Sequence, residues 1–491
     1  MQRRSFLRLA GAAAAMPLRG AVAKPRNIVV ILADDIGYGD LGCYGATKVK
    51  TPSLDRLASQ GIRFTDGHSG AATCTPTRYS LMTGEYAWRK KGTNILPGDA
   101  NLVIDTKRTT LPQLMQKAGY TTGCVGKWHL GLGDRKIDWN KEVSPGPREV
   151  GFDYHFIIPA TGDRTPCVFM ENGKVVGLDP KDPIEVNYQD RIGTDPTGKE
   201  HPELLKMKLT HGHDFTIVNG ISRIGYMSGG NAARWVDEDI ADTITGKATA
   251  FIDKNKTKPF FLYFATHDIH VPRVPHKRFV KTSQCGTRCD AIQQFDWSVG
   301  ELMKALDRNG LTQDTLIVVS SDNGAVLDDG YADGAIPDLN GHTPSGALQG
   351  GKYSPYEGGT RVPFLVRWPA KVKAGKSDAL VSQIDLLASF ATLTGQTLSA
   401  DAAPDSFDVL PALLGESPAG REMLIEQSSK IGIRAGRWKL IAANNLKQKP
   451  ELYDLVADLA ETKDLAEANP AKVRELEGML DGARKAGRTR R

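Results

Sequence analysis

The chain has 491 residues, of which 24% are charged and 40% hydrophobic, values that are ordinary for a soluble globular protein. They argue against an intrinsically disordered chain and against one embedded in a membrane. The formal net charge of +6 is small and scattered, apart from a basic tail at Arg484–Arg491, so a nucleic-acid partner is not expected. This length fits one large domain together with a smaller one.

The first 23 residues have the composition of an export signal. Arg3-Arg4-Ser5-Phe6-Leu7 begins an apolar run to Met16, and the small residues Ala21-Val22-Ala23 follow it. The run is too short to span a bilayer. Its paired arginines resemble the twin-arginine signal, with an ordinary secretory signal as the alternative. The mature chain is therefore expected in the periplasm or outside the cell, without membrane contact.

Six cysteines are too few to form a disulfide scaffold in a chain of this length. Cys285 and Cys289 are the expected bridge, on proximity and compartment alone. If Cys74 is reserved for chemistry, five cysteines remain, so at least one must be unpaired.

Short, nearly continuous apolar runs predict strands that are buried on both faces, which is typical of parallel sheets. These runs are Asn27–Ala33, Thr121–Val125, Phe260–Ala265, Leu316–Ser320 and Phe364–Trp368. Between them, Pro52–Gln60 and Leu111–Ala118 predict helices, because each begins after a threonine and stops at a glycine. Alternating strands and helices indicate a doubly wound α/β domain with a mostly parallel sheet.

The chain is expected to divide into the signal at 1–23, a main domain at 24–400 and a smaller α+β domain at 412–491. A polar, Gly/Pro-rich stretch at 134–230 predicts an insertion that carries substrate loops, and the composition of Gln396–Pro411 predicts a linker. The smaller domain is expected to contain short antiparallel strands at Met423–Gln427, Ile431–Ile433 and Trp438–Ala442, and a closing helix at Ala471–Lys485.

Polar side chains follow four of the predicted strands. The first strand ends in Asp34-Asp35, the second leads to Lys127 and His129, the third to His267 and His270, and the fourth to Asp322-Asn323. Ligands of open α/β sheets bind beyond the carboxyl ends of the strands. The two aspartate pairs supply only oxygen, which favours a hard cation such as Ca²⁺ or Mg²⁺ over zinc. A helix cap is the alternative for Asp34-Asp35.

Cys74 begins the motif Cys74-Thr75-Pro76-Thr77-Arg78. Pro76 suits the first turn of a helix, which places Cys74 at a helix N-terminus, where backbone N–H groups and the dipole favour an anion. A thiol in that position is expected to have a lowered pKa. These residues predict a reactive cysteine beside an arginine, with a buried structural cysteine as the alternative.

The motif Cys74-x-Pro76-x-Arg78, followed by Thr83-Gly84, is similar to the signature of type I sulfatases, in which a separate enzyme oxidises the cysteine to formylglycine (3-oxoalanine). The chain resembles the arylsulfatase A and N-acetylgalactosamine-6-sulfatase group of this family, within the alkaline phosphatase superfamily. Thr77 and Met82 are mild departures from the family pattern. The resemblance covers nearly the whole mature chain, through Asn27–Gly42, Thr51–Gly61, Gly126–Gly131, Ser321–Gly324, Gly351–Pro363 and Glu451–Ala466.

The resemblance implies an alkaline-phosphatase-like fold, with 24–400 as the catalytic domain, and a hydrolase of sulfate esters that contains one Ca²⁺ per chain. The implied ligands of Ca²⁺ are Asp34, Asp35, the modified Cys74, Asp322 and Asn323. The residues implied around the sulfate are Arg78, Lys127, His129, His270 and Lys352.

The family chemistry assigns a role to several of these side chains. A hydroxyl of the hydrated formylglycine attacks sulfur, with Asp322 as the candidate base. His270, with help from Lys352, is expected to protonate the leaving alcohol, and His129 to accept a proton when sulfate departs. The implied partners are a formylglycine-generating enzyme during maturation and a sulfated small molecule or glycan, with a carbohydrate sulfate favoured over an aryl sulfate.

Two other functions compete with this interpretation. One is a phosphonate or phosphodiester hydrolase of the same superfamily, although such enzymes tend to have histidine where this chain has Asn323. The other is an inactive, carbohydrate-binding relative. The loops Pro159–Pro166 and Ile221–Arg234 are expected to set specificity.

Four further histidines have weaker assignments. His68 and His267 are candidates for a sugar subsite. His211 and His213 have the spacing of a metal pair on one strand face, but solvent-exposed loop residues are the favoured interpretation.

Overall fold

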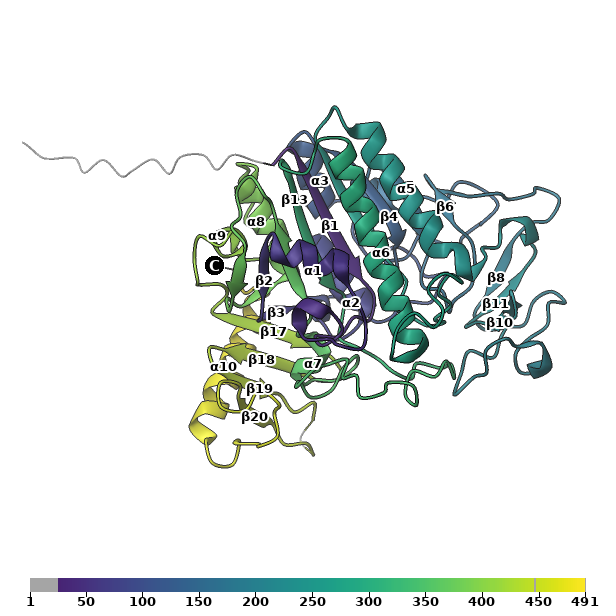
Figure 1. Cartoon of the computed structure of the whole chain (residues 1–491). Coiled ribbons are helices and arrows are strands. Elements are labelled where there is room, and N and C mark those ends of the chain that lie inside the picture. Colours follow the sequence, from purple (N-terminus) through teal and green to yellow (C-terminus); the bar gives the residue numbers. More distant parts are fainter. Residues whose placement is uncertain (1–24, 446, 491) are drawn as a thin grey trace, which may run out of the picture.

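The computed structural model describes residues 25–445 and 447–490, so the predicted export signal at 1–23 lies outside the described residues. A ten-stranded mixed sheet runs through the molecule (Figure 1). Five consecutive strands in its centre run parallel to one another. In spatial order the strands are β15 (Gly375–Ser377), β2 (Ile62–Phe64), β14 (Phe364–Arg367), β13 (Thr315–Ser321), β1 (Asn27–Ala33), β12 (Phe260–Ala265), β4 (Thr121–Lys127), β5 (Tyr154–Ile158), β6 (Met170–Glu171) and β7 (Lys174–Val175).

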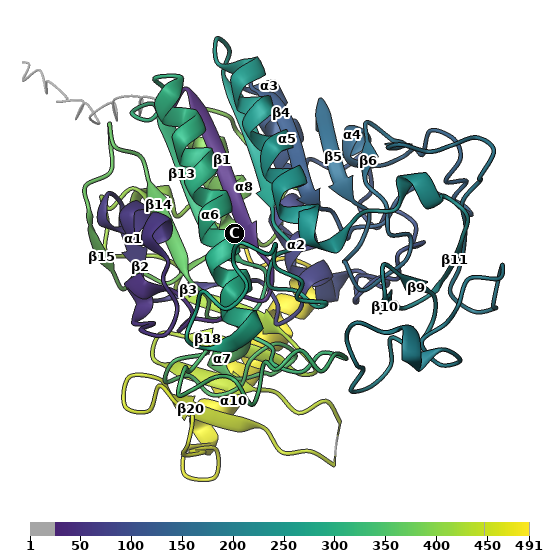
Figure 2. The same cartoon turned by 45° about the vertical axis from the view of Figure 1, so that its right-hand side comes forward.

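Helices cover both faces of this sheet. Alternate residues of β1 enter two separate cores, with Ile28 and Val30 in one and Val29 and Ile31 in the other. The first core is completed by α2 (Cys74–Thr83), α3 (Leu111–Lys117) and α8 (Leu386–Leu393). The second is completed by α1 (Pro52–Ser59), α5 (Ile240–Asn255) and α6 (Gly286–Arg308), and Figure 2 shows α5 and α6 in front of the strands. This arrangement confirms the predicted doubly wound α/β fold.

Two expectations about the sheet are wrong. The segment expected as a parallel strand at Phe364–Trp368 forms β14, which runs antiparallel to β13. Because β14 lies inside the sheet, between β13 and β2, its apolar run reflects burial and carries no information on direction. The stretch 134–230 is more than an insertion, because Tyr154–Ile158 forms β5 and pairs with β4.

The remaining short elements lie around the large sheet. Two-stranded sheets pair β3 (Gly67–His68) with β16 (Val381–Ser382), β8 (Glu185–Asn187) with β11 (Tyr226–Ser228), and β9 (Ile217–Val218) with β10 (Ile221–Ser222). The short helices are α4 (Pro147–Val150), α7 (Glu357–Thr360) and α9 (Leu410–Leu413). A disulfide joins Cys285 and Cys289 at the start of α6, as expected, and the other four cysteines are free.

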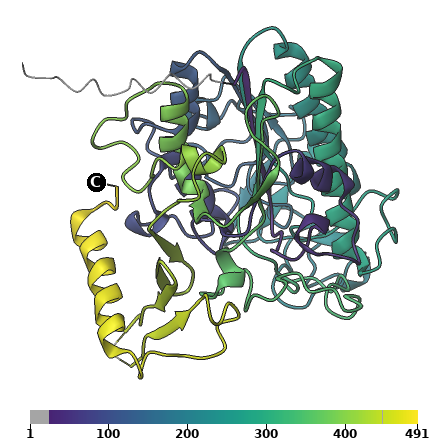
Figure 3. The ribbon, with the colours of Figure 1, turned by 60° about the vertical axis from the view of Figure 1, so that its left-hand side comes forward.

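The C-terminal part contains a four-stranded antiparallel sheet and a helix that packs beside it (Figure 3). The elements are β17 (Met423–Gln427), β18 (Ile431–Ala435), β19 (Trp438–Ile441), β20 (Glu451–Asp454) and α10 (Pro470–Ala486). Leu424, Ile433 and Leu440 of the sheet share a core with Leu476 and Leu480 of α10. This confirms the smaller α+β unit, whereas the domain boundaries at 400 and 412 remain predictions. None of the helices in the described ranges, including the 23-residue α6, has the apolar length that a membrane span needs.

A cluster of buried charged side chains connects this small sheet to the main body of the protein. We call it the interface cluster; it consists of Asp66, His68, Glu357, Arg361, Glu426, Arg434, Lys439 and Glu461. His68 Nδ1 lies 2.9 Å from Glu426 Oε1, and its Nε2 lies 2.9 Å from Asp66 Oδ1. Because each ring nitrogen faces a carboxylate, both must donate, and the ring is an imidazolium. His68 is therefore a structural residue, and its assignment to a sugar subsite is wrong.

The interface cluster should make stability depend on pH. Burial lowers the pKa of His68, but hydrogen bonds from its ring to Asp66 and Glu426 outweigh burial and raise the pKa above its ordinary value. A histidine whose pKa is raised in the folded state stabilises the protein fully at pH values below its ordinary, unfolded-state pKa. This stabilisation is lost as pH rises through the pKa of the folded state. At pH 6 we expect His68→Leu to lower the free energy of unfolding by about 3–5 kcal/mol, the cost of breaking a buried ion pair.

Urea unfolding at pH 6 and at pH 9 measures this effect. The difference between His68→Leu and the unsubstituted protein should shrink at the higher pH. His201→Leu is the control, because His201 is exposed and its ring contacts the nearby Glu203. A His68→Leu difference that is the same at both pH values would contradict the imidazolium assignment.

Candidate active site

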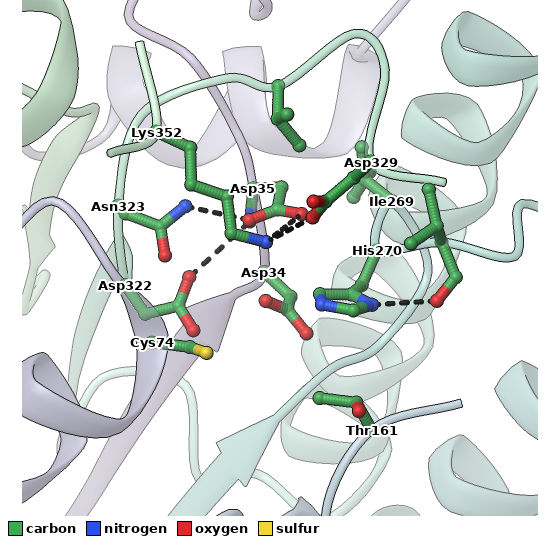
Figure 4. Close-up of polar contacts among 12 residues, drawn as sticks. Asp34, Asp35, Cys74, Thr161, Ile269, His270, Asp322, Asn323, Asp329 and Lys352 are labelled. Carbon is green, nitrogen blue, oxygen red and sulfur yellow. Dashed lines mark hydrogen bonds and ion pairs between the residues drawn. The ribbon is translucent and has the colours of Figure 1, made fainter. Parts of the chain in front are cut away.

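The carboxyl ends of four neighbouring parallel strands meet at one edge of the large sheet. Asp34 follows β1, Lys127 ends β4, His270 lies beyond β12, and Asp322 follows β13. All four side chains are buried. Figure 4 shows several of the side chains from these strand ends together with Cys74, which is the first residue of α2. The strand ends that the sequence predicted to converge are therefore brought together.

Side-chain oxygen atoms cluster on one side of the site. Asp34, Asp35 and Asp322 each place a carboxylate oxygen within 4.8 Å of the other two. Asn323 Nδ2 donates to Asp35 Oδ1 over 2.7 Å. Among the described residues, Asp34 Oδ1 and Asn323 Oδ1 are buried and have no hydrogen-bond partner. A buried oxygen without a partner costs about 1–3 kcal/mol. The all-oxygen donor set and its two unpartnered atoms therefore fit a hard divalent cation.

Two positively charged side chains pair with the clustered carboxylates. Lys127 Nζ lies 2.6 Å from Asp34 Oδ2, and Arg78 Nε and Nη2 donate to Asp322 Oδ2 over 3.1 and 2.7 Å. Burial raises the pKa of Asp34, but the charge of Lys127 and smaller contributions from neighbouring side chains together outweigh burial and hold that pKa well below its ordinary value. For Asp322, burial and the neighbouring charge of Asp34 prevail, and the pKa rises to about 7. Asp34 is therefore the more firmly ionised of the two.

Lys352 completes the positive side of the site. Its Nζ lies 3.1 Å from Asp35 Oδ2 and 2.8 Å from Asp329 Oδ2. Burial lowers the pKa of Lys352, but Asp35 and Asp329 outweigh burial and raise it well above its ordinary value. Lys352 is therefore an ammonium ion at neutral pH.

His129 is oriented toward Cys74. Its Nδ1 lies 3.3 Å from Cys74 Sγ, and its Nε2 lies 2.9 Å from the carbonyl oxygen of Leu96. Because a carbonyl oxygen can only accept, Nε2 carries the proton and Nδ1 presents a lone pair to residue 74. Burial and the charge of Lys127 hold the pKa of His129 well below its ordinary value, so the ring is neutral.

The expected lowering of the thiol pKa is wrong. Cys74 does begin a helix, but burial raises the pKa of its thiol, and the charges of Lys127 and Lys352 do not reverse this shift. The loss of hydration destabilises a fully buried thiolate by more free energy than its interaction with the helix N-terminus contributes. Residue 74 is therefore well placed for chemistry, but its thiol is not activated as a thiolate.

Two histidines follow β12. His270 Nδ1 lies 2.7 Å from the carbonyl oxygen of Val271, which leaves Nε2 available for a ligand. Burial and the charge of Lys127 lower the pKa of His270 to about 4, so the ring is neutral in the ligand-free site. His267 is also buried, with its Nδ1 3.9 Å from Asp34 Oδ2. Its contact with a sugar remains a prediction.

The sequence did not indicate Asp329 or Arg164 as members of the site. Asp329 lies in the long loop after β13, away from any strand end or motif, yet it binds Lys352. Arg164 lies in the predicted specificity loop Pro159–Pro166, and its positive charge lowers the pKa of His129.

The two predicted specificity loops support each other. Arg223 Nη1, from the second loop, donates to the carbonyl oxygen of Gly162 in the first over 2.6 Å. His213 is buried, with its Nε2 3.0 Å from Asp163 Oδ2, so its assignment as an exposed residue is wrong. His211 is exposed, as expected.

Comparisons with known proteins agree with this geometry. The sulfatase family profile matches residues 26–396, and the profile described as N-sulphoglucosamine sulphohydrolase, C-terminal, matches residues 351–483. The chain is 52% identical over 474 residues to N-acetylgalactosamine-6-O-sulfatase of Bacteroides thetaiotaomicron, covering 93% of each protein. It is 31% identical over 436 residues to human arylsulfatase A, covering 85% of this chain and 75% of that protein.

A solved structure supports the same grouping. It is a Bacteroides thetaiotaomicron protein associated with the metabolism of multiple glycosaminoglycans, and it matches with a TM-score of 0.92 and 52% identity. The match covers 94% of this chain and 99% of the solved one. The chain belongs to the sulfatase family, whose members hydrolyse sulfate esters.

Proposed function

We propose that this sulfatase acts on carbohydrate sulfate esters, with N-acetylgalactosamine 6-sulfate as the first substrate to test. Its nucleophile is formylglycine made from Cys74, and its metal is one Ca²⁺. The observation that carries this proposal is the position of Cys74, at the start of α2 and 3.3 Å from His129, beside three clustered carboxylates. The relative that shares 52% identity, named for a sugar sulfate, supports the choice of substrate.

The proposed ligands of Ca²⁺ are Asp34, Asp35, Asp322, Asn323 and the oxygen of modified residue 74. The buried, unpartnered oxygens of Asp34 and Asn323 support this assignment. When bound, the ion supplies positive charge that stabilises sulfate oxygens and a hydroxyl nucleophile.

The first half of the reaction transfers the sulfo group to residue 74. Hydrated formylglycine has two hydroxyl groups on one carbon, and one of them attacks sulfur while Asp322 takes its proton. The bond between sulfur and the sugar oxygen breaks, and His270 gives the departing oxygen a proton. Arg78, Lys127 and Lys352 stabilise the negative charge on the other sulfate oxygens, and Lys352 also supports the leaving group.

The second half releases sulfate. The remaining hydroxyl of residue 74 gives its proton to Nδ1 of His129, its oxygen forms the aldehyde double bond, and the carbon–oxygen bond to sulfate breaks. The hydrogen bond between His129 Nε2 and the Leu96 carbonyl supports this role, because it leaves Nδ1 free to accept. Water then hydrates the aldehyde, and inorganic sulfate leaves the site.

His270 must gain a proton before it can act as the acid. Its pKa of about 4 belongs to the ligand-free site, where burial and Lys127 disfavour the charged ring. A negatively charged sulfate ester bound between Lys127 and His270 would counter that charge and raise the pKa of His270. Substrate binding would therefore prepare the acid.

His270→Ala tests the substrate class and the acid together. On a sugar sulfate, whose alkoxide needs a proton to depart, we expect the substitution to lower kcat by roughly 10²–10⁴-fold. On an aryl sulfate with an acidic phenol, the loss should be much smaller. Sulfate release measures both rates, and His155→Ala, which replaces a buried histidine within β5, is the control.

The outcomes separate two kinds of failure. Equal losses on both substrates would remove His270 from the acid role and leave Lys352 as the better candidate. Cleavage of aryl sulfates alone by the unsubstituted enzyme, with no sulfate released from any sugar, would contradict the carbohydrate assignment.

We further propose that residues 1–23 direct export and that a formylglycine-generating enzyme modifies Cys74 during maturation. The mature sulfatase would then work in the periplasm or outside the cell. The paired arginines at 3 and 4 support export by the twin-arginine route.

A further inference from the structure

A cavity of about 330 Å³ lies next to the sulfate site and takes no part in the reaction described above. Its walls come from the start of α2, from the segments around residues 94 and 353, and from the end of β17 with the turn that follows it. The lining residues are Thr73, Pro76, Asn94, Ile95, Tyr353, Gln427, Ser428 and Ser429. Thr73 directly precedes Cys74, and Tyr353 directly follows Lys352. The volume lies at the lower end of the range of small-molecule sites, about 300–1,000 Å³.

Backbone hydrogen bonds hold three of these walls together. The N–H of Ala72 donates to the carbonyl of Gln427 over 2.7 Å, and the N–H of Tyr353 donates to the carbonyl of Ala72 over 2.8 Å. A single residue therefore links the start of the Cys74 helix, the segment that carries Lys352, and the C-terminal sheet. The cavity has a fixed position relative to the reacting groups.

Tyr353 forms an exposed aromatic wall. It is 42% exposed, and its φ of 73° lies in the left-handed region, which costs a non-glycine residue about 1–3 kcal/mol. Its hydroxyl donates to Asp329 Oδ1 over 3.0 Å, and the other oxygen of Asp329 binds Lys352. The surroundings thus hold a strained tyrosine beside the site, with an apolar ring face and a polar tip.

The rest of the lining is polar but uncharged. Asn94, Gln427, Ser428 and Ser429 offer amide and hydroxyl groups, and none of the residues that line the cavity carries a formal charge. Gln427 Oε1 is buried and has no hydrogen-bond partner among the described residues. Such a lining can satisfy the hydroxyl or acetamido groups of a ligand, but it offers no counter-charge to a carboxylate or a second sulfate.

We propose that this cavity is a sugar subsite, which binds an uncharged sugar unit joined to the sulfated one. Tyr353 supplies the face on which the ring packs, and Gln427 with the neighbouring serines supplies hydrogen bonds. The inference rests on the proposed carbohydrate function, and it predicts that the enzyme prefers an oligosaccharide whose neighbouring unit is neutral over one whose neighbouring unit is a uronate.

The test compares three substrates in the mature enzyme: N-acetylgalactosamine 6-sulfate alone, the same unit linked to galactose, and the same unit linked to glucuronate. We expect kcat/KM to be at least about tenfold higher for the galactose disaccharide than for the monosaccharide, on the scale of a few good hydrogen bonds and ring contacts. The glucuronate disaccharide should show no such gain.

Ser429→Trp would fill the cavity from the exposed turn, and Gln427→Ala would remove the unpartnered acceptor. Both should remove most of the disaccharide advantage while changing kcat/KM on the monosaccharide by less than about twofold, because neither side chain contacts the reacting groups. Ser59→Trp, on the exposed end of α1, is the matched control. Gln427→Ala remains the readout if the tryptophan variant does not fold.

Each outcome bears on a separate claim. If the enzyme turns over the monosaccharide and kcat/KM is no higher for the disaccharide, the subsite proposal is overturned and the proposed function stands. The same conclusion follows if the variants lose equal factors in kcat/KM on the monosaccharide and on the disaccharide. An equal or greater gain from glucuronate would overturn the neutral character of the subsite. Absence of turnover on every sugar sulfate, with aryl sulfate cleaved, would instead overturn the proposed function.

Discussion

Cys74→Ala should abolish sulfate release while the protein stays folded. Alanine offers neither a thiol for oxidation to the aldehyde nor an oxygen for attack, and removing a catalytic nucleophile lowers kcat by roughly 10⁴-fold or more. The thiol is small, and within the described ranges its one polar contact is to His129, so its loss should cost little stability. Cys124→Ala is the matched control, because Cys124 is also buried and free but lies within β4.

Peptide mass analysis tests directly whether residue 74 is converted to formylglycine. In protein purified from its natural host, the peptide that contains residue 74 should be lighter than the cysteine form, by the exchange of thiol for aldehyde. An intact cysteine in fully active protein, or a Cys74→Ala variant with the unsubstituted rate, would end the formylglycine proposal.

Removal of divalent cations should inactivate the enzyme, and Ca²⁺ should restore it. Without a cation, the clustered carboxylates of Asp34, Asp35 and Asp322 repel one another, and two buried oxygens lack partners. Binding should therefore also raise the melting temperature, because a ligand at 100 times its Kd stabilises a folded protein by about 2.7 kcal/mol. Thermal unfolding of the chelated protein, with and without Ca²⁺, measures this effect without relying on turnover.

Asp34→Asn keeps the size of one ligand but removes its charge, so it should weaken the Ca²⁺-dependent shift in melting temperature. Asp55→Asn, which replaces a carboxylate outside the site on α1, should leave that shift unchanged. Restoration of activity by Zn²⁺, with no response to Ca²⁺, would contradict the assignment of these residues to a calcium site.

Much of the site could be predicted because strand ends are visible in the sequence. Buried runs such as Asn27–Ala33 are easy to recognise, and the carboxyl ends of parallel strands must meet at one edge, so Asp34 and Asp322 could be placed together from nearly 290 residues apart. The direction of β14 was not accessible, since an interior strand is apolar whichever way it runs. Asp329 was missed because it lies in a loop, whose path depends on tertiary packing.

Electrostatic properties were the least predictable from sequence. The helix N-terminus at Cys74 is a local feature and was found, but the burial that raises its pKa comes from distant segments. His68 shows the same limit: its two carboxylate partners lie two and 358 residues away, so no local pattern reveals that its ring holds two protons.

The interface cluster has a consequence for how this enzyme can be divided. Glu357 lies five residues after Lys352, and its carboxylate binds Lys439 of β19 over 2.9 Å. A fragment ending near residue 400 would keep every proposed catalytic side chain, yet it would lose Lys439, Glu426 and Arg434. Glu357 would then keep Arg361 as a counter-charge but lose Lys439, and His68 would lose its contact with Glu426. The large sheet is therefore not a minimal enzyme, and separate expression of the two halves should yield activity only when both are present to reassemble.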